Sequence, residues 1–348
     1  MKSSNSKFVK SIRVVVPLAL AVGILWWMYR GIGWEELVDA LSHKMSWTWM
    51  LLSLPFGVLA QVLRAIRWRQ VLAPAGERPR LSTCIHAVFL SYASSLVVPR
   101  VGEVLRCGIL RRYEGTNFSL GIGTVVTERI IDTLLILVLS VLTFLTQIPV
   151  FLHFFQETGV SMDSLFGRFS LTGWLVTAAS GLLALIAIVL LVRRFGTAPS
   201  KSPQGETAES TPTRGRRRGA GLWNGLLSVR EVESPLLFIL YSVGIWVSYY
   251  LHFYLTFFCF DFTAGLGPLA ALVAFVVGTF AVLVPTPNGA GSWHFAVKTV
   301  LVLYGVGQTD AALFVLIVHT LQTLLVALLG VWSSVVLALR KKNAARGD

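Results

Sequence analysis

Charged residues and cysteines are scarce in this sequence. Only 14% of its 348 residues are charged, 55% are apolar, and the mean hydropathy is +0.70. That composition excludes most water-soluble enzymes, and it excludes disorder for the bulk of the chain. The three cysteines, Cys84, Cys107 and Cys259, are scattered, and they match neither a disulfide framework nor the ligand spacing of a metal site.

Signatures of catalysis are also missing. The sequence has no paired-aspartate metal motif, no Ser/His/Asp ordering and no phosphate-binding loop, because the Gly121-x-Gly123 pair lacks a third glycine and a preceding strand. We therefore predict a protein that is not an enzyme and that holds no cofactor and no metal. A polytopic enzyme of lipid or polyprenyl metabolism stays open as an alternative.

Long apolar runs stand in place of these motifs. The first, Val14 to Tyr29, follows four basic residues, and no small-x-small cleavage site comes after it. We interpret it as an uncleaved span and not as a signal peptide. Other apolar runs reach about eighteen residues and more, a length typical of membrane-spanning helices. We predict an all-α polytopic membrane protein, a single integral domain over 1–348, with about six full spans. The other full spans are predicted at 46–63, 118–147, 171–193, 235–258 and 310–338.

Two further apolar stretches are interrupted. Thr83–Val98 stops at a proline and precedes a basic amphipathic stretch, 101–112. Ala264–Val284 stops at the Pro/Gly-rich segment 285–291 and precedes 292–304. Each pattern predicts two half-helices around a break, which is a re-entrant hairpin, and the apolar segments then number seven to eight. Non-helical backbone at membrane depth is tolerated only where protein or a water-filled cavity covers it.

The basic excess indicates orientation. Lys and Arg number 30 against 17 Asp and Glu, a net charge of +13, and in a membrane protein such residues concentrate on the cytoplasmic side. A cytoplasmic amino terminus with two re-entrant hairpins places most of them there, whereas a full crossing by 83–98 would move four arginines outside. We therefore predict cytoplasmic termini, a bacterial-type cytoplasmic (inner) membrane, and no nucleic-acid partner. The segment 197–221, rich in Pro, Ser, Thr, Gly and Arg, predicts a disordered basic cytoplasmic linker.

This topology contains an inverted repeat. Residues 46–147 form a span, a hairpin and a span, and residues 235–338 form the same series in the opposite direction. Leu96 to Pro99 in the first hairpin is echoed by Val282 to Pro285 in the second. We expect the two breaks to meet near the membrane midplane, where transporters of this design hold their substrate.

Six ionisable residues of the first half fall where lipid would otherwise be. One such charge at the centre of a spanning helix costs about 2.5–3.5 kcal/mol, so these side chains must face protein or water. They form either an internal salt-bridge network or a head-group site, and in the local form of the network Arg129 reaches Asp132 three residues along the helix. In the head-group interpretation Arg100 and Arg106 engage a lipid phosphate, while the three carboxylates either balance charge or meet a cationic part of the head group. The six residues are Arg100, Glu103, Arg106, Glu128, Arg129 and Asp132.

Two other groups of residues complete the predicted site. Arg64 and Arg67 continue the 46–63 helix, and we interpret them as a basic interfacial anchor. In the second hairpin, glycines permit positive φ and leave backbone amides free to meet an anion at the start of the next half-helix. We interpret His294 as a satisfied hydrogen-bonding residue. The residues singled out in this hairpin are Pro285, Pro287, Asn288, Gly289, Gly291 and His294.

Taken in order, these motifs resemble the transmembrane, flippase-like domain of lysylphosphatidylglycerol synthases. Arg64 to Trp68 meet an Arg-x-x-Arg-Trp segment, and Val98 to Arg106 match Pro-x-Arg-x-Gly-Glu-x-x-Arg in a shortened form, without the residue between Pro and Arg. Glu128, Arg129 and Asp132 meet Glu-Arg-x-x-Asp. The last family motif is Pro-x-Pro-Gly-Gly-x-Gly-x-x-Glu, and the residues that meet it are Pro285, Pro287, Gly289 and Gly291. The sequence departs from this pattern at two positions: Asn288 replaces a glycine, and His294 stands where the family usually has glutamate.

The resemblance implies lipid translocation. The expected partner is a membrane lipid, an anionic or modified, for example aminoacylated, phospholipid, and an oligomer stays open. The sequence ends at Asp348 with a short basic tail, so we expect a stand-alone membrane member without the synthetase domain. An ion-coupled carrier of a small solute is the remaining alternative.

Overall fold

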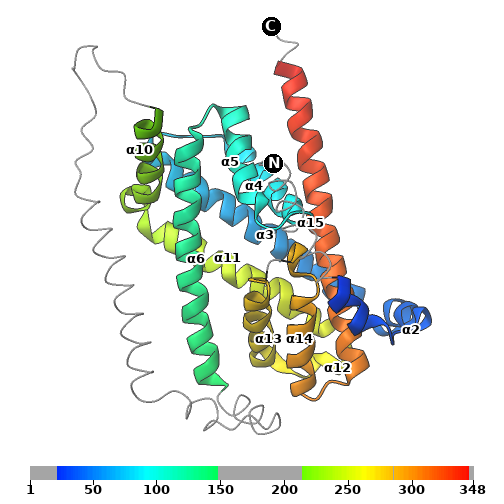
Figure 1. The fold of residues 1–348 in the computed structure, drawn as a ribbon. Helices are drawn as coiled ribbons and strands as arrows, with labels where there is room; N and C mark the ends of the chain where they lie inside the picture. The colour runs from blue at the N-terminus through cyan, green and yellow to red at the C-terminus, as the bar shows by residue number, and fades with distance from the viewer. Residues whose placement is uncertain (1–21, 148–213, 285, 345–348) are drawn as a thin grey trace, which may run out of the picture. The chain divides into compact units, whose positions relative to one another are not determined.

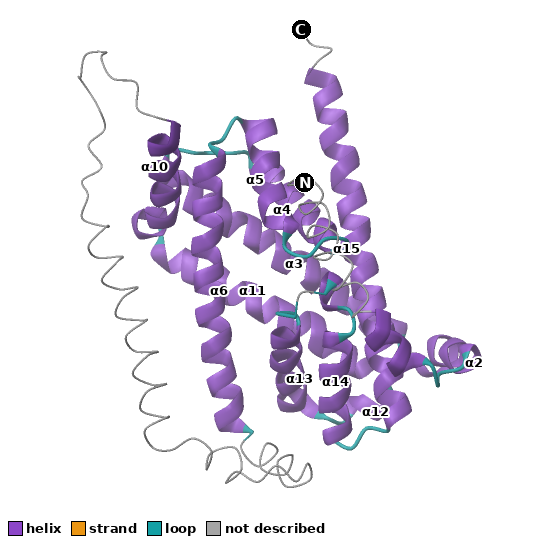
Figure 2. Ribbon diagram, viewed as in Figure 1, coloured by secondary structure: helices purple, strands orange, loops and turns teal. Residues whose placement is uncertain are grey.

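The computed structural model describes residues 22–147, 214–284 and 286–344. The chain divides into two compact units, one formed by 1–146 with 218–348 and the other by 147–217. Apart from the first four residues of α10 (Arg214–Leu227), the first unit contains every element considered below, and in the described residues all regular structure is helical (Figures 1 and 2). The all-α prediction is therefore confirmed.

Among the residues that the structure describes, three helices are long and apolar enough to cross a membrane. They are α3 (Trp47–Leu72), α11 (Pro235–Tyr254) and α15 (Gln308–Ala344), and they coincide with three of the predicted spans. The predicted span 118–147 is a helix of 29 residues, α6 (Phe118–Thr146). Residues 22–29 of the first run are helical, while 14–21 and the predicted span 171–193 lie outside the described residues. The total number of spans and the cytoplasmic termini stay predictions.

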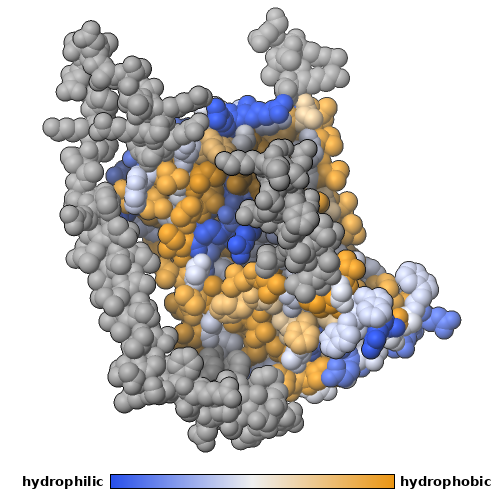
Figure 3. All heavy atoms as spheres, viewed as in Figure 1, coloured by the Kyte–Doolittle hydropathy of each residue, from blue (hydrophilic) through white to orange (hydrophobic). Residues whose placement is uncertain are grey.

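One side of α6 carries an exposed apolar stripe. Leu134, Val138, Val141 and Leu145 follow each other at spacings of four, three and four, and each is more than half exposed. This spacing puts them on one face of the helix. An exposed leucine and valine stripe of this length is the surface that a lipid bilayer covers. Figure 3 shows the same character more broadly, a mostly apolar face with a hydrophilic patch near its centre.

Both predicted helix breaks are present. The first hairpin consists of α4 (Leu81–Ser95) and α5 (Val101–Glu114), and α5 begins after Arg100, whose φ is +64°. The second consists of α13 (Gly267–Ala281) and α14 (Ser292–Leu303), separated by a 3₁₀ turn, Pro287–Gly289. Pro285 lies outside the described residues.

Positive φ angles at the second break explain its residue types. Asn288, Gly289 and Gly291 have φ of +53°, +69° and +84°. Glycine adopts this region without strain, and asparagine is among the few other residues that enter it. Gly289 and Gly291 thus have the positive φ that their residue type was expected to permit.

The shorter elements connect these helices. Part of the predicted linker 197–221 differs from expectation, because residues from Arg214 onward form helix α10, whereas the residues before it lie outside the described chain. A basic, glycine-rich sequence is a poor helix former by propensity. Packing compensates, because Gly225 of α10 lies in close contact with Gly123 of α6. The connecting elements are α2 (Trp34–Asp39), a π-helix (Ala40–Lys44), α10 (Arg214–Leu227), α12 (Asp261–Ala264), and 3₁₀ turns at Ala73–Ala75, Ser228–Glu231 and Leu255–Cys259.

Each hairpin packs against helices of both halves. The first half-helix α4 lies against α3 of its own half and α15 of the other, and α13 lies against α11 of its own half and α6 of the other. The second half-helices α5 and α14 contact α6 and α15, and α3 packs along α11. Each hairpin is thus packed between a long helix of its own half and a long helix of the other.

Candidate functional site

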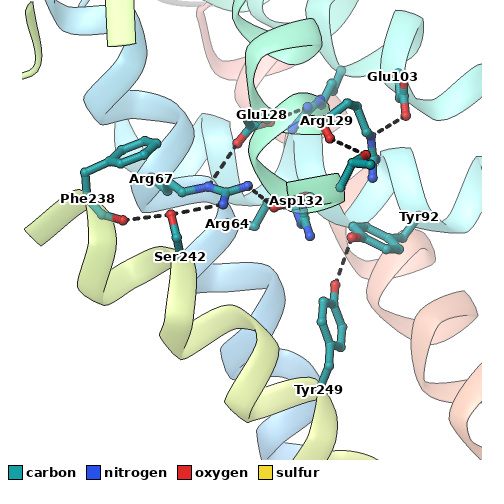
Figure 4. A network of polar contacts seen from close by, with 12 residues as sticks. Arg64, Arg67, Tyr92, Glu103, Glu128, Arg129, Asp132, Phe238, Ser242 and Tyr249 are labelled. Atoms are coloured by element: carbon teal, nitrogen blue, oxygen red, sulfur yellow. Dashed lines mark hydrogen bonds and ion pairs between the residues drawn. The ribbon is translucent and has the colours of Figure 1, made fainter. Parts of the chain in front are cut away.

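Two arginines of α3 hold one carboxylate of α6 (Figure 4). Arg64 Nη1 donates to Asp132 Oδ2 at 2.5 Å, and Arg67 Nη2 donates to Asp132 Oδ1 at 2.8 Å. Arg67 also donates to Ser242 Oγ of α11 at 3.2 Å. Arg64, Arg67 and Asp132 are 3%, 0% and 5% exposed. Interactions between charges so well removed from water are strong, and an unpaired charge there is costly.

A second carboxylate extends this network towards α5. Glu128 is fully buried and accepts a hydrogen bond from Arg106, and its Oε1 lies 3.7 Å from Arg67 Nε. The Arg106 guanidinium also lies over the Trp68 ring, 4.5 Å from its centroid, a cation–π geometry. Trp68 in turn donates to Thr124 Oγ1 at 2.9 Å. The network therefore fastens α5 and α3 to α6.

This buried cluster has a positive excess. Among the described residues it contains three arginines, Arg64, Arg67 and Arg106, against the two carboxylates Glu128 and Asp132. Three donors, Arg64 Nε, Arg67 Nε and Arg106 Nε, and one acceptor, Glu128 Oε1, are buried without a hydrogen-bond partner. A buried cluster with one surplus positive charge favours an additional anion.

The structure corrects the interpretation of Arg64 and Arg67 as an interfacial anchor. Both side chains are buried in the cluster, because α3 continues as one helix to Leu72 and turns this face towards α6. Residues three apart on α3 and four apart on α6 each share a helix face, so the two pairs meet across the interface. Sequence spacing identified each pair but not the pairing between them.

The local pair between Arg129 and Asp132 is also wrong. Asp132 is already held from α3, and Arg129 turns to the first hairpin instead, where its Nε lies 2.6 Å from Glu103 Oε1. These two side chains are 46% and 33% exposed. The ion pair therefore joins α6 to α5 at a position that is more exposed than the buried cluster. Arg100 is exposed at the start of α5.

A cavity of about 480 Å³ adjoins the cluster. Arg64, Arg129 and Asp132 line it from α3 and α6, and Tyr92 and Tyr249 line it from α4 and α11. The two tyrosine hydroxyls are hydrogen-bonded to each other at 2.8 Å (Figure 4). Arg100 and Arg106, which the sequence suggested as phosphate ligands, are not among the lining residues, and Arg106 is occupied by Glu128.

The second break contributes neutral polar groups to the same cavity. Asn288 Nδ2 donates to Thr323 Oγ1 at 2.7 Å, and His319 Nε2 lies 3.2 Å from the Asn288 carbonyl oxygen. The rest of the wall is largely aromatic and aliphatic, and it includes Trp246 and Trp293. The cavity is therefore amphipathic, with charged residues from the first half and hydrogen-bonding and apolar residues from the second.

The backbone amides of the second break are already engaged. Gly289 N donates to Thr286 O at 3.2 Å, Ala290 N donates to Pro287 O at 2.9 Å, and Gly291 N donates to His294 Nδ1 at 3.3 Å. The expected free anion-binding amides are thus absent at these positions of the described chain. His294 is buried and satisfied by Gly291, as predicted, and its ring lies 4.4 Å from that of His319.

Several lining residues were not anticipated from the sequence. Gln61, Tyr92, Trp246, Tyr249 and His319 lie within apolar segments and belong to no motif. The available signal was the spacing of Gln61 to Arg64, which places a polar side chain one turn before the arginine on the same face of α3. In the described residues no group of three or more His, Cys, Asp or Glu side chains is placed to hold a metal.

Comparison with known proteins gives two relatives and one family. A UPF0104 membrane protein of Methanothermobacter thermautotrophicus is 24% identical over 136 residues, which cover 38% of each chain. A protein named glycosyltransferase AglD, of Haloferax volcanii, is 30% identical over 80 residues, 23% of this chain. The matches span 38% and 13% of the lengths of these two relatives. The lysylphosphatidylglycerol synthase TM region matches residues 14–330, which include both hairpins and the buried cluster. The chain is therefore a membrane protein that belongs to the family of the lysylphosphatidylglycerol synthase TM region.

Proposed function

We propose that this protein binds an anionic phospholipid in the cavity and moves its head group across the cytoplasmic membrane, as a flippase does. One observation carries the proposal: a buried cluster with one more arginine than carboxylate adjoins a cavity with largely apolar walls. A phosphodiester supplies the missing negative charge, and acyl chains match the apolar walls. Arginine is well suited to this role because its planar donors fit phosphate oxygens.

Arg64 and Arg129 are the proposed phosphate ligands. Both line the cavity, and Arg64 keeps one buried donor, Nε, without a partner. Arg64 and Arg129 take the place of Arg100 and Arg106, which the sequence predicted as phosphate ligands and which do not line the cavity. Arg67 and Arg106 then do not contact the lipid but hold Asp132 and Glu128 in place.

An inverted repeat of 46–147 and 235–338 supports a transport cycle. In the contact pattern, α4 meets α15 and α13 meets α6, so each hairpin packs on the last helix of the other half. Exchange of the two halves leaves this pattern unchanged, which a two-fold inverted repeat requires. We propose that the halves rock against each other around the cavity, with both termini cytoplasmic and the two hairpins re-entrant.

A membrane enzyme of lipid metabolism is the second candidate. The observation that favours it is the similarity to a relative whose name is that of a glycosyltransferase. Such an enzyme would lose activity with chelators where it uses a metal, and it would convert the lipid chemically. Product analysis of the lipids after incubation with the purified protein therefore separates the two candidates.

Proteoliposomes test lipid movement. A membrane-impermeant reductant abolishes the fluorescence of labelled phosphatidylglycerol that reaches the outer leaflet. The rate of fluorescence loss therefore measures translocation. We expect Arg129→Gln to slow this rate at least about tenfold, because one charge-assisted contact is worth roughly 1.5–3 kcal/mol. Arg129 is partly exposed, so the variant retains its fold.

Arg78→Gln is the matched control for this experiment. Arg78 forms a comparable exposed pair with Glu233, at 3.5 Å, and does not line the cavity. We expect it to translocate lipid at the rate of the unmodified protein. Equal rates for both variants, or a rate no higher than that of protein-free liposomes, would refute the proposed function.

A further inference from the structure

We propose that the cavity selects a phospholipid whose phosphate carries a neutral, hydroxyl-rich head group, such as glycerol, inositol or a sugar, over one whose head group carries an amine. This inference rests on the proposed function, because it assigns a chemical class to the lipid held in the same cavity. It follows from the charges, the unpartnered polar atoms and the neutral groups that line the cavity.

A cationic head group finds no available carboxylate. Asp132 is the only acidic residue that lines the cavity among the described residues, and its two oxygens accept hydrogen bonds from Arg64 and Arg67. Glu103 is outside the lining and is paired with Arg129. An ammonium group in the cavity would instead approach Arg64 and Arg129. Like charges brought together in a partly desolvated site oppose binding.

Two buried polar atoms in the cavity wall lack partners. Gln61 is 3% exposed, and its acceptor Oε1 has no hydrogen-bond partner; Trp246 has a buried donor, Nε1, also without one. Both residues line the cavity. A hydroxyl both donates and accepts, so vicinal hydroxyls of one head group satisfy an acceptor and a donor at once. An ammonium group donates only, and it leaves the indole donor unmatched.

The second break adds neutral groups of the same kind. Asn288, Thr323, Gln322 and His319 line the cavity with amide, hydroxyl and imidazole functions. Asn288 and His294 stand at positions where the sequence departs from its family pattern, and His294 accepts a hydrogen bond from Gly291 N instead of providing a carboxylate. The described wall on this side therefore recognises hydrogen-bonding groups without attracting positive charge.

The experiment compares three lipids in proteoliposomes, two that are monoanionic and one that bears amines, and each is labelled on an acyl chain. Phosphatidylglycerol carries hydroxyls, phosphatidylethanol has the same charge without hydroxyls, and lysylphosphatidylglycerol adds amines. We expect phosphatidylglycerol to be translocated roughly tenfold faster than either of the others, the effect of leaving one buried polar group unmatched. Rates for lysylphosphatidylglycerol or phosphatidylethanol equal to that of phosphatidylglycerol would overturn the inference while leaving the proposed function in place. Failure to move all three would overturn the proposed function itself.

Two variants show which groups select the head group. Gln61→Leu removes the unpartnered acceptor, and we expect the ratio of phosphatidylglycerol to phosphatidylethanol rates to fall towards one. Asn288→Asp places a carboxylate in the cavity, and aspartate tolerates the positive φ of this position. We expect it to raise the lysylphosphatidylglycerol rate severalfold.

Leu142→Ala, on the exposed face of α6, is the control and should leave all three rates unchanged. Selectivity unaltered by both cavity variants would contradict the assignment of Gln61 and Asn288.

Discussion

At the scale of single residues, Asp132 is the centre of the buried cluster. It receives hydrogen bonds from two arginines of α3, and one of these, Arg67, is fully buried and also reaches Ser242 of α11. Helical spacing in the sequence predicted that Glu128 and Asp132 share a face. It could not predict their partners, because Asp132 lies 68 and 65 residues from Arg64 and Arg67 in the sequence and periodicity does not identify the neighbouring helix.

Removal of the Asp132 charge should destabilise the protein strongly. Asp132→Asn leaves Arg64 and Arg67 buried without their anion, and breaking a buried ion pair in this way costs about 3–5 kcal/mol. We expect a clear decrease in the thermal unfolding temperature in detergent. Asp39→Asn is the matched control, because Asp39 pairs with Lys44 on an exposed helix end and its loss should have little effect. Similar unfolding temperatures for the two variants would show that the cluster does not hold the helices together.

At the scale of elements, the first hairpin depends on a close contact at its break. A Cβ built on Gly102 would overlap the carbonyl oxygen of Ser91, whereas nothing lies within 4 Å of a Cβ at Gly108 in the same helix. The sequence predicted the break from its proline, but a glycine that follows a break looks the same whether it supplies flexibility or space. Only the packing of α5 on α4 distinguishes the two roles.

The two glycines of α5 should therefore respond in opposite directions to alanine. Gly102→Ala forces the half-helices apart and should destabilise the protein by about 1–3 kcal/mol, the usual cost of overpacking. Gly108→Ala meets open space and should be neutral or stabilise by about 0.5–1 kcal/mol, because alanine is the better helix former. Thermal unfolding of the two variants gives the comparison. Destabilisation by Gly108→Ala as large as that by Gly102→Ala would rule out the proposed contact.

The other end of this hairpin is closed by Glu114. Its carboxylate accepts hydrogen bonds from Thr83 Oγ1 at 2.5 Å and from Arg80 Nε at 2.9 Å, so the end of α5 is fastened to the start of α4. Burial alone would raise the pKa of this carboxyl, but the hydrogen bonds from Thr83 and Arg80 outweigh burial and lower the pKa below its ordinary value. The ionised form is thus favoured in the folded protein.

The lowered pKa predicts a pH dependence of stability. A carboxyl with a depressed folded-state pKa contributes stability above its unfolded-state pKa, near 4.3, and loses it as the pH falls through the folded-state value. Glu114→Gln should therefore lower the free energy of unfolding at pH 7 by about 1 kcal/mol, which appears as a lower unfolding temperature than that of the unmodified protein. The difference should diminish below about pH 4. A difference that is constant with pH, or that grows on acidification, would contradict this role of Glu114.

At the scale of the whole molecule, the cavity lies where the helices of both halves converge. Its lining comes from α3, α4 and α6 of the first half and from α11, α13, α14, α15 and the second break of the other. The order of the described helices and breaks was predictable from apolar runs and prolines. The cavity was not, because its residues Gln61, Tyr249 and His319 belong to different segments and come together only through packing.

Lipid retained by the purified protein tests the central claim most directly. Native mass spectrometry after mild detergent extraction identifies a bound lipid by its mass, without a transport assay. The account predicts one retained anionic phospholipid per chain, lost from Arg129→Gln and kept by the matched surface variant Arg78→Gln. Retention of zwitterionic and anionic lipids alike, with no change in Arg129→Gln, would contradict it.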